Sequence, residues 1–538
     1  MAPPPHNDDR TALVVGAGLV GTLCAAMLAS RGWTVTLVEY RSDPRLGSQA
    51  ERARSINLAL SPRGVEALRS VSDELADRVV KEGIEMRGRM VHKKTGSGKG
   101  IAKQGQDYGV YDEGEVIRSI SRTQLGIYLL DHVDGLPKSG RGSVQTRFEE
   151  KLVEMDLRKD GPVEVVLQKK GGEPTHERFD FVVGGDGAYS KVRRELMRGS
   201  AGRFDYHQYY APHSYLELSI PAGPDNTFSI EPNYLHIWPR GEFMLIALAN
   251  QDKSFTLTLF AHHSTFSSLD LQLSSKTDSS SNPVVELFRA EFPDALELMG
   301  EEALMKSWNG NPKDGLITVE CSPYHYQGKA LLIGDAAHAM VPFYGQGMNC
   351  GFEDVRVLSS VLDQFSASPS PLIPSPLPYS SITSPPLAAS FSASSPPSLS
   401  DNLARALEAY TTLRAPSLAA IQRLAHQNYT EMASSVLSPL YLLRLSLDSI
   451  LSRLFSLPFL AAERAPEPTR DHGGKWESLY RMTTFRPGVA YEEVIRRREW
   501  QGRVIEWAAR AVASAAIVGV GVAGWIKYGG KWKIVRVA

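Results

Sequence analysis

The segment TALVVGAGLVGTLCAAMLASRGWTVTLVEYR (Thr11–Arg41) constrains the fold more than any other part of the chain. It contains an apolar strand, then Gly16, Gly18 and Gly21 at G-x-G-x-x-G spacing, an Ala-rich helix, and a second strand that ends in Glu39. In such a unit the first glycine permits a tight turn, the second lets a pyrophosphate approach, and the third lets helix and strand pack closely. The helix N-terminus attracts phosphate, and Glu39 can accept hydrogen bonds from ribose hydroxyls. This order predicts a dinucleotide-binding α/β domain, and a purely structural glycine turn would leave Glu39 unexplained.

Two later segments repeat the pattern of an apolar strand followed by glycine and aspartate. FDFVVGGDGAYSKVRREL (Phe179–Leu196) contains Asp186, and ALLIGDAAHAMVPFYGQGMN (Ala330–Asn349) contains Asp335. FAD and NAD both satisfy the first fingerprint. Two additional cradles suit an extended ligand held along a ribityl chain and a pyrophosphate, so the three segments together favour FAD.

The rest of the composition is that of a globular chain of two or three domains. It has 538 residues, 42% of them hydrophobic and 22% charged, and a net charge of −1, which gives no basic field for nucleic acid. Three cysteines are too few for a disulfide framework or a zinc site and fit a reducing compartment, and no metal site is expected. The N-terminal MAPPPHNDDR lacks the patterns of a signal or matrix transit peptide, so we expect no such leader.

Strand and helix patterns predict an α/β fold with an inserted sheet. Apolar strands are expected at Ala12–Val15, Thr34–Val38, Phe179–Val183 and Ala330–Ile333, and the alternating runs HSYLELSI, FMLIALAN and FTLTLF indicate antiparallel strands. We therefore predict a discontinuous Rossmann-like FAD-binding domain and a substrate domain with an antiparallel sheet. The first comprises residues 10–75, 115–200 and 325–365, and the second residues 76–114 and 201–324.

The C-terminal third is predicted to be helical, with one interruption and an apolar end. The Ser/Pro-rich residues 366–400 should form a disordered loop between helices at Gly351–Phe365 and Leu403–Met432, the latter kinked or broken at Pro416. Residues 401–505 form the helical region, in which Ser438–Leu460 could pack on the body or lie on a membrane surface. Residues 506–530 carry an uncharged stretch between Arg510 and Lys527, with tryptophans nearby. That stretch is shorter than a secure membrane span of about 20 residues. We favour a membrane anchor over a buried small-residue helix.

The three cofactor segments resemble the flavin-dependent aromatic hydroxylases, single-component monooxygenases with GxGxxG, DG and GD motifs. The resemblance implies that Asp335 binds the FAD ribityl or ribose and that GQGMN (Gly345–Asn349) lays amides against the flavin pyrimidine edge. It links Asp186 and Arg122 to the handling of FAD and NADPH. The implied cofactor-binding residues are Gly16, Gly18, Val20, Gly21, Glu39, Arg41, Ala59, Arg122, Asp186, Asp335, Gly347, Met348 and Asn349.

Further segments are similar to the members of that family that hydroxylate L-kynurenine. They are RSINLALSPRG (Arg54–Gly64), MRGRMVH (Met86–His92), YGVYDEGEVIRSISRTQL (Tyr108–Leu125), NYTEM (Asn428–Met432) and LYRMTTF (Leu479–Phe485). The resemblance implies that Arg89, Tyr108, Asn428 and Tyr480 bind the substrate, and a guanidinium can grip an α-carboxylate through two hydrogen bonds. From the residues alone, Arg89 could instead form a surface salt bridge with Glu85, and Asn428 and Tyr480 could serve packing or capping.

The implied reaction uses NADPH and O₂: NADPH reduces FAD, O₂ adds at flavin C4a, and the hydroperoxide hydroxylates the ring. No catalytic base is expected, and His338 beside Asp335 is expected to shape its turn. No second nucleotide cradle is evident, so NADPH should dock transiently. The resemblance also suggests an enzyme of tryptophan degradation on the mitochondrial outer membrane, with the catalytic body facing the cytosol. Alternatives are a flavin hydroxylase of another amino-aromatic acid, or a membrane-tethered FAD protein with little turnover.

Overall fold

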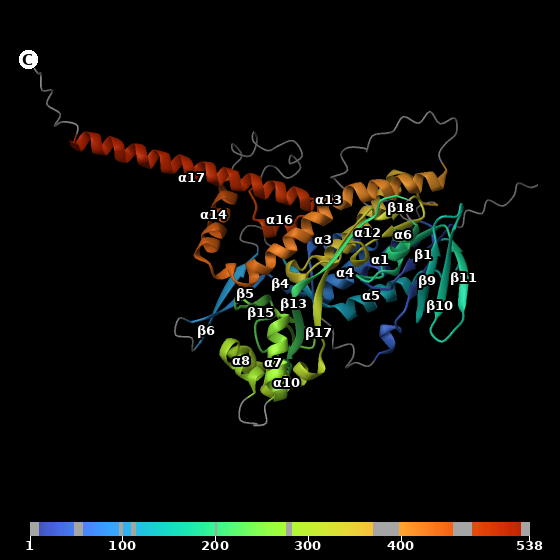
Figure 1. Cartoon of the computed structure of the whole chain (residues 1–538), viewed down its shortest axis with the longest axis horizontal. Coiled ribbons are helices and arrows are strands. Elements are labelled where there is room, and N and C mark those ends of the chain that lie inside the picture. Colours follow the sequence, from blue (N-terminus) through green and yellow to red (C-terminus); the bar gives the residue numbers. More distant parts are fainter. Residues whose placement is uncertain are drawn as a thin grey trace, which may run out of the picture.

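The computed structural model describes residues 10–47, 57–95, 100–108, 115–199, 202–275, 282–369, 398–455 and 476–528. Figure 1 shows mixed α/β layers with long helices along one side of the molecule. Most of the Ser/Pro-rich run, the N-terminal nine residues and the last ten residues lie outside the described residues, together with the predictions made for them.

A six-stranded sheet carries the dinucleotide fingerprint. Its order is β18-β19-β12-β1-β2-β8, and every pair is parallel except β18 with β19. The strands are β1 (Thr11–Val15), β2 (Thr34–Glu39), β8 (Val144–Phe148), β12 (Phe181–Gly184), β18 (His325–Tyr326) and β19 (Ala330–Leu332). α1 (Leu19–Ser30) packs against this sheet and in turn contacts α5 (Arg122–Asp134) and α12 (Gly347–Gln364). Central strands buried on both faces must be apolar throughout, which is why their sequences were recognisable.

The inserted sheet has seven strands in the order β17-β13-β16-β15-β14-β5-β6. They are β5 (Gly88–Lys94), β6 (Ile101–Asp107), β13 (Asp205–Ile220), β14 (Tyr234–Pro239), β15 (Phe243–Ala249), β16 (Phe255–His262) and β17 (Lys313–Ser322). The predicted antiparallel strands are confirmed for β13, β15 and β16. A purely antiparallel sheet is wrong, because β5 comes from an earlier segment and joins β14 in parallel, with Arg89 opposite Leu235.

Two small antiparallel sheets and several short helices complete the body. One sheet joins β11 (Pro174–Phe179), β10 (Val163–Lys169) and β9 (Glu150–Asp156), and the other β3 (Asn57–Leu60), β7 (Ile117–Ser121) and β4 (Ile84–Met86). The predicted strand Phe179–Val183 is in fact the end of β11 followed by the start of β12. The helices are α3 (Pro62–Arg69), α4 (Asp73–Glu82), α6 (Lys191–Gly199), α7 (His263–Ser275), α8 (Pro283–Glu291), α9 (Pro293–Met299) and α10 (Glu301–Gly310).

The C-terminal region consists of α13 (Leu399–Ala433), α14 (Pro439–Phe455), α16 (Leu479–Phe485) and α17 (Tyr491–Tyr528). The break predicted at Pro416 is absent: α13 continues past it, with Arg414 and Ser417 on either side held in buried hydrogen bonds. The boundary predicted between residues 505 and 506 lies inside α17, whose far end projects from the body (Figure 1). Within the described part of the chain, no helix combines the length and apolar character needed to cross a membrane.

Candidate functional site

The first glycine turn has the geometry that a dinucleotide requires. Gly16 has φ +99°, and a Cβ there would lie 2.6 Å from the Gly185 carbonyl oxygen. A Cβ on Gly21 would lie only 2.0 Å from the Gly16 oxygen, so this glycine is what permits α1 to approach β1. A Cβ on Gly18 would meet no atom of the described chain within 4 Å, and no described side chain caps the start of α1. Open space in front of an uncapped helix N-terminus suits an anionic pyrophosphate.

Glu39 is mostly buried at the end of β2 and currently bonds to the backbone. Its Oε2 accepts from the Ala17 amide at 3.0 Å and its Oε1 from the Arg41 amide at 3.0 Å. Each carboxylate oxygen can accept a further hydrogen bond, so ribose hydroxyls can be added without breaking these contacts. Arg41 itself is exposed, with its guanidinium carbon 4.7 Å from the centre of the Tyr40 ring.

The glycine–aspartate turn after β19 is packed against α1 by close contacts. Gly334 has φ +56°, and a Cβ there would lie 3.2 Å from Cγ2 of Val20. The same methyl group would lie 2.6 Å from a Cβ on Gly351, so Val20 acts as a wedge between two glycines. Asp335, the first residue of α11 (Asp335–His338), is exposed just beyond this contact. The turn therefore presents a carboxylate next to the start of α1.

Asn349 joins the start of α12 to the end of β3. Its Oδ1 accepts from the Ser61 amide at 2.9 Å, and its Nδ2 donates to the carbonyls of Ala59 at 2.9 Å and Gly345 at 2.8 Å. Gly345 has φ +66° and lies within GQGMN, where Gly347 and Met348 are half-buried and no described side chain caps α12. Asn349 thus holds this turn, and the amides at the start of α12 are available for a ligand such as the flavin edge.

The two remaining predicted cofactor residues, Asp186 and Arg122, lie in different settings. The Asp186 carboxylate accepts from the Ser190 hydroxyl at 2.5 Å and from the amides of Lys191 and Val192, so it caps α6. Burial raises its pKa, although these hydrogen bonds oppose that effect. Arg122 is the exposed first residue of α5. The structure therefore gives Asp186 a local structural task and leaves Arg122 at the surface.

Three of the four predicted substrate residues come together, two from the paired strands β5 and β6 and their end, and one from α16 (Leu479–Phe485). The Arg89 guanidinium carbon lies 4.3 Å from the Tyr480 ring centre, and Tyr108 stacks on Tyr480 with centres 5.0 Å apart. Arg89 is buried in β5, and its Nε and the Tyr108 hydroxyl are buried without a well-aligned hydrogen bond to any described residue. Burial raises the pKa of Tyr108 well above its usual value, so this hydroxyl keeps its proton. Unsatisfied buried donors are costly, and their convergence indicates a binding site for an anionic or carbonyl group.

The surroundings of Arg89 include residues that the sequence did not single out. Its Nη1 lies 3.4 Å from Oε1 of Glu431, and the same oxygen accepts from the Tyr441 hydroxyl at 2.9 Å. Glu431 lies in NYTEM, a segment already noted, whereas nothing local marked Tyr441 on α14. The surface salt bridge considered for Arg89 is wrong, because Glu85 pairs with Arg118 at 2.6 Å.

The fourth predicted residue, Asn428, lies on α13 one turn before Glu431. It is buried, and its Nδ2 donates to the Phe343 carbonyl at 2.7 Å. The structure thus ties it to η3 (Pro342–Tyr344), directly before GQGMN. Tyr344 in turn stacks on Tyr480 with ring centres 5.8 Å apart. The substrate residues and the turn assigned to the flavin edge therefore adjoin.

His338 is linked to the glycine–aspartate turn through Asp354, as expected of a residue that shapes this turn. Its Nε2 hydrogen-bonds the buried Asp354, whose Oδ2 also accepts from the Gly334 amide at 2.9 Å. His338, Asp354 and Cys350 offer three metal-ligand atoms within 4.8 Å of one another. The Arg414 guanidinium already contacts both Asp354 and Cys350, and its positive charge opposes a metal ion there.

The three cysteines are free and buried. Burial is the main cause that raises the thiol pKa values of Cys24, Cys321 and Cys350, that of Cys321 to about 12. They therefore remain protonated at neutral pH.

Comparison with known proteins identifies the relatives of this chain. The family model described as an FAD binding domain matches residues 9–210 and 236–367. The kynurenine 3-monooxygenase of Cryptococcus neoformans (strain B-3501A) is 40% identical over 537 residues, covering 96% of each chain. The enzyme of that name from Yarrowia lipolytica is 40% identical, covering 94% of this chain and 96% of its own. That from Saccharomyces cerevisiae is 35% identical, covering 93% and 94%.

Solved structures with the same fold include two oxygenases. One is 2-methyl-3-hydroxypyridine-5-carboxylic acid oxygenase, with a TM-score of 0.54 and 20% identity, covering 81% of this chain and 95% of that one. Another is PqsL, a probable FAD-dependent monooxygenase from Pseudomonas aeruginosa, with a TM-score of 0.56 and 17% identity, covering 79% and 97%. At this identity the likeness concerns the fold alone.

Proposed function

Because the chain belongs to the kynurenine 3-monooxygenase family and carries its FAD-binding domain, we propose that it hydroxylates L-kynurenine to 3-hydroxykynurenine. The balanced reaction consumes one NADPH, one proton and one O₂ and releases NADP⁺ and water. When bound, FAD supplies the transfer of reducing equivalents and the activation of oxygen. Gly18, Asp335 and the amides at the start of α12 would hold FAD, because they combine open space, an exposed carboxylate and an uncapped helix N-terminus.

The observation that carries the substrate assignment is the convergence of buried donors at Arg89. A kynurenine has an α-carboxylate, an α-ammonium, a ketone and an aniline ring. Arg89 binds the carboxylate, and the protonated Tyr108 hydroxyl donates a further hydrogen bond. Glu431, beside Arg89, offers a carboxylate to the ammonium group. The Tyr480 and Tyr344 rings form an aromatic wall that orients the aniline ring and excludes water.

The test follows substrate-dependent NADPH oxidation by the full chain purified in detergent with FAD. L-Kynurenine should stimulate NADPH oxidation and yield 3-hydroxykynurenine, identified by mass spectrometry. Anthranilate and salicylate are the comparison substrates. Turnover with either of these and none with kynurenine would refute the proposal and favour another aromatic hydroxylase. Bound FAD without NADPH oxidation under any of the three would favour the non-catalytic alternative.

We also propose that the C-terminal tail attaches the protein to the mitochondrial outer membrane, with the catalytic body facing the cytosol. Supporting this, α17 exposes large apolar side chains along its far half, including Ile517 and Val520, and α14 exposes Leu440, Leu443 and Ile450. Exposed apolar helix faces of this kind suit a lipid interface. Fractionation of cells that express the full chain or residues 1–505 tests this. Recovery of both forms in the soluble fraction would contradict it. A protease added to intact, isolated mitochondria cannot cross the outer membrane, so protection of the catalytic body from digestion would contradict the cytosolic orientation.

A further inference from the structure

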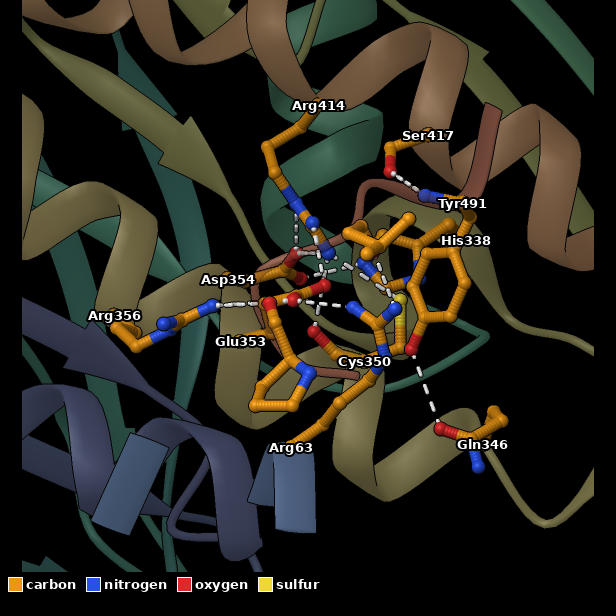
Figure 2. Close-up of polar contacts among 12 residues, drawn as sticks. Arg63, His338, Gln346, Cys350, Glu353, Asp354, Arg356, Arg414, Ser417 and Tyr491 are labelled. Atoms are coloured by element: carbon orange, nitrogen blue, oxygen red, sulfur yellow. Dashed lines mark hydrogen bonds and ion pairs between the residues drawn. The ribbon is translucent and has the colours of Figure 1, made fainter. Parts of the chain in front are cut away.

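A buried set of charged residues joins α3, α12 and α13 (Figure 2). Arg63 Nη1 and Glu353 Oε1 are 2.8 Å apart, and Arg414 Nη1 lies 2.8 Å from the other oxygen of Glu353. Arg414 also donates from Nε to Asp354 Oδ1 at 2.9 Å, and Arg356 adds a contact to Glu353 at 3.3 Å. We call these five residues the arginine network. Charges this deeply buried are tolerated only when their polar atoms have partners.

The network also bonds to the backbone of the segment 479–491, which spans α16 and the start of α17. Arg63 donates from Nε to the Thr483 carbonyl at 2.7 Å and from Nη2 to the carbonyls of Val489 and Met482. Arg356 donates to the Pro487 carbonyl at 3.0 Å. These carbonyls lie at or after the end of α16, where a helix leaves acceptors unsatisfied. One guanidinium, that of Arg63, therefore docks three carbonyls of this segment.

Tyr491 connects the same segment to the turn assigned to the flavin. Its ring lies over the Arg63 guanidinium at 4.2 Å, and its hydroxyl donates to Gln346 Oε1 at 3.2 Å (Figure 2). Gln346 precedes the first residue of α12 within GQGMN. At its other end the segment carries Tyr480, which stacks with Tyr344 and covers Arg89. The segment thus touches both the substrate residues and the flavin turn.

We propose that Arg63 is a positioning residue for the hydroxylation: by docking the segment 479–491 it sets Tyr480 over Arg89 and, through Tyr491, fixes Gln346 in the flavin turn. Arg63 touches neither substrate nor cofactor in this arrangement. Arg63 thereby links the conformation of the substrate pocket to the conformation of the flavin turn. The inference rests on the proposed kynurenine hydroxylation and adds to it a residue that lies outside every segment assigned to substrate contact.

The decisive variant is Arg63→Lys in the FAD-loaded full chain. Lysine keeps a cation beside Glu353, but its single nitrogen cannot serve three carbonyls in the fork geometry of a guanidinium. We expect the KM for kynurenine to rise about tenfold, the effect of losing one charge-assisted hydrogen bond, with FAD content retained. The control is Arg69→Lys, an exposed arginine of the same helix paired with Asp73 and Asp77, which should match the wild type.

A second variant tests the contact of the segment with the flavin turn separately from its contact with the substrate residues. Tyr491→Phe keeps the ring over Arg63 and removes only the hydroxyl donated to Gln346. It should lower the yield of 3-hydroxykynurenine per NADPH by at least about twofold, because one neutral hydrogen bond contributes about 1 kcal/mol, and leave KM unchanged. A purely structural role would give a different result, in which FAD content and Tm fall while the KM and the yield of the folded fraction stay at wild-type values.

Hydrogen–deuterium exchange of peptides covering residues 479–491 tests the docking without reference to turnover. Exchange should be at least about tenfold faster in Arg63→Lys than in Arg69→Lys, since each tenfold step corresponds to about 1.4 kcal/mol of opening free energy. Equal exchange in the two variants, or a KM and yield of Arg63→Lys within twofold of wild type, would overturn the inference. If the wild type itself does not hydroxylate kynurenine, the proposed function fails, and the exchange comparison still decides whether Arg63 docks the segment.

Discussion

Replacing Arg89 by methionine should remove activity while sparing stability. In the protein without substrate, the Arg89 guanidinium stacks on Tyr480 and lies 3.4 Å from Glu431, a partly exposed carboxylate, while its Nε is buried without a well-aligned hydrogen bond to any described residue. The stacking contributes about 0.5–2 kcal/mol, and the unsatisfied donor costs about 1–3 kcal/mol. These contributions offset one another, so the variant should unfold within about 1 kcal/mol of the wild type, a Tm change of about 2–4 °C at most.

With kynurenine bound, the same change removes the partner of the α-carboxylate. Truncating one side of a buried, hydrogen-bonded charge pair costs about 2–5 kcal/mol. At about 1.4 kcal/mol per factor of ten, kcat/KM should fall by about 30-fold to several thousand-fold. Steady-state formation of 3-hydroxykynurenine gives kcat/KM, and thermal unfolding of the FAD-loaded chain without substrate gives Tm.

Arg87→Met is the matched control for this experiment. Arg87 is two residues away, is exposed, and also stacks on a tyrosine, with its guanidinium carbon 5.0 Å from the Tyr234 ring centre. It should change kcat/KM by less than about threefold, in keeping with the small energies of exposed contacts. A large loss of Tm in Arg89→Met, together with kcat/KM near the wild-type value, would refute the reading of Arg89 as a substrate residue and make it a structural one.

Two further changes test the cofactor cradle and the buried charges. Gly21→Ala places a Cβ 2.0 Å from the Gly16 oxygen and should lower both Tm and the flavin absorbance per protein, whereas Gly18→Ala should keep the Tm of the FAD-free protein and weaken FAD binding. If both variants lose Tm equally, the open space at Gly18 has been misread. Burial opposes ionisation of Glu353, but Arg63 and Arg414 hold its pKa below the usual 4.5. Its contribution to stability is therefore complete above pH 4.5 and is lost as the pH falls through the lowered folded-state pKa. The free energy of unfolding of Glu353→Gln, followed by urea titration, should be lower at pH 7 and vary less with pH below 4.5, and an unchanged acid slope would contradict this.

The cofactor domain was predictable because its signals are local. The fingerprint of residues 11–41 places strand, glycine turn, helix and acid within one supersecondary unit, and each glycine has a distinct steric task that the structure reproduces at Gly16 and Gly21. The continuous apolar character of the central strands marked a sheet covered on both faces. The parallel pairing of β5 with β14 was not predictable in this way, because pairing between residues 88 and 234 leaves no trace in either local pattern.

Of the site residues, only those within segments that resemble the family were predictable. Arg89, Tyr108 and Tyr480 were assigned through resemblance, and the structure brings them together. Tyr441 and the arginine network escaped notice: the network comes from three separate segments, at Arg63, at residues 353–356 and at Arg414, and within each segment its charges look like ordinary surface charges. At Pro416 local propensity predicted a kink or a break in α13. The break does not occur, and the helix continues past the proline between two residues held in buried hydrogen bonds, Arg414 and Ser417.

The burial of all three thiols has a consequence for an enzyme of this chemistry. Flavin monooxygenation that fails to reach its substrate releases hydrogen peroxide, and peroxide attacks thiolates in preference to thiols. With Cys24, Cys321 and Cys350 shielded and protonated, the described chain offers this oxidant no reactive sulfur on cysteine. Burial of these three thiols therefore protects them from oxidation to sulfenic acids or mixed disulfides.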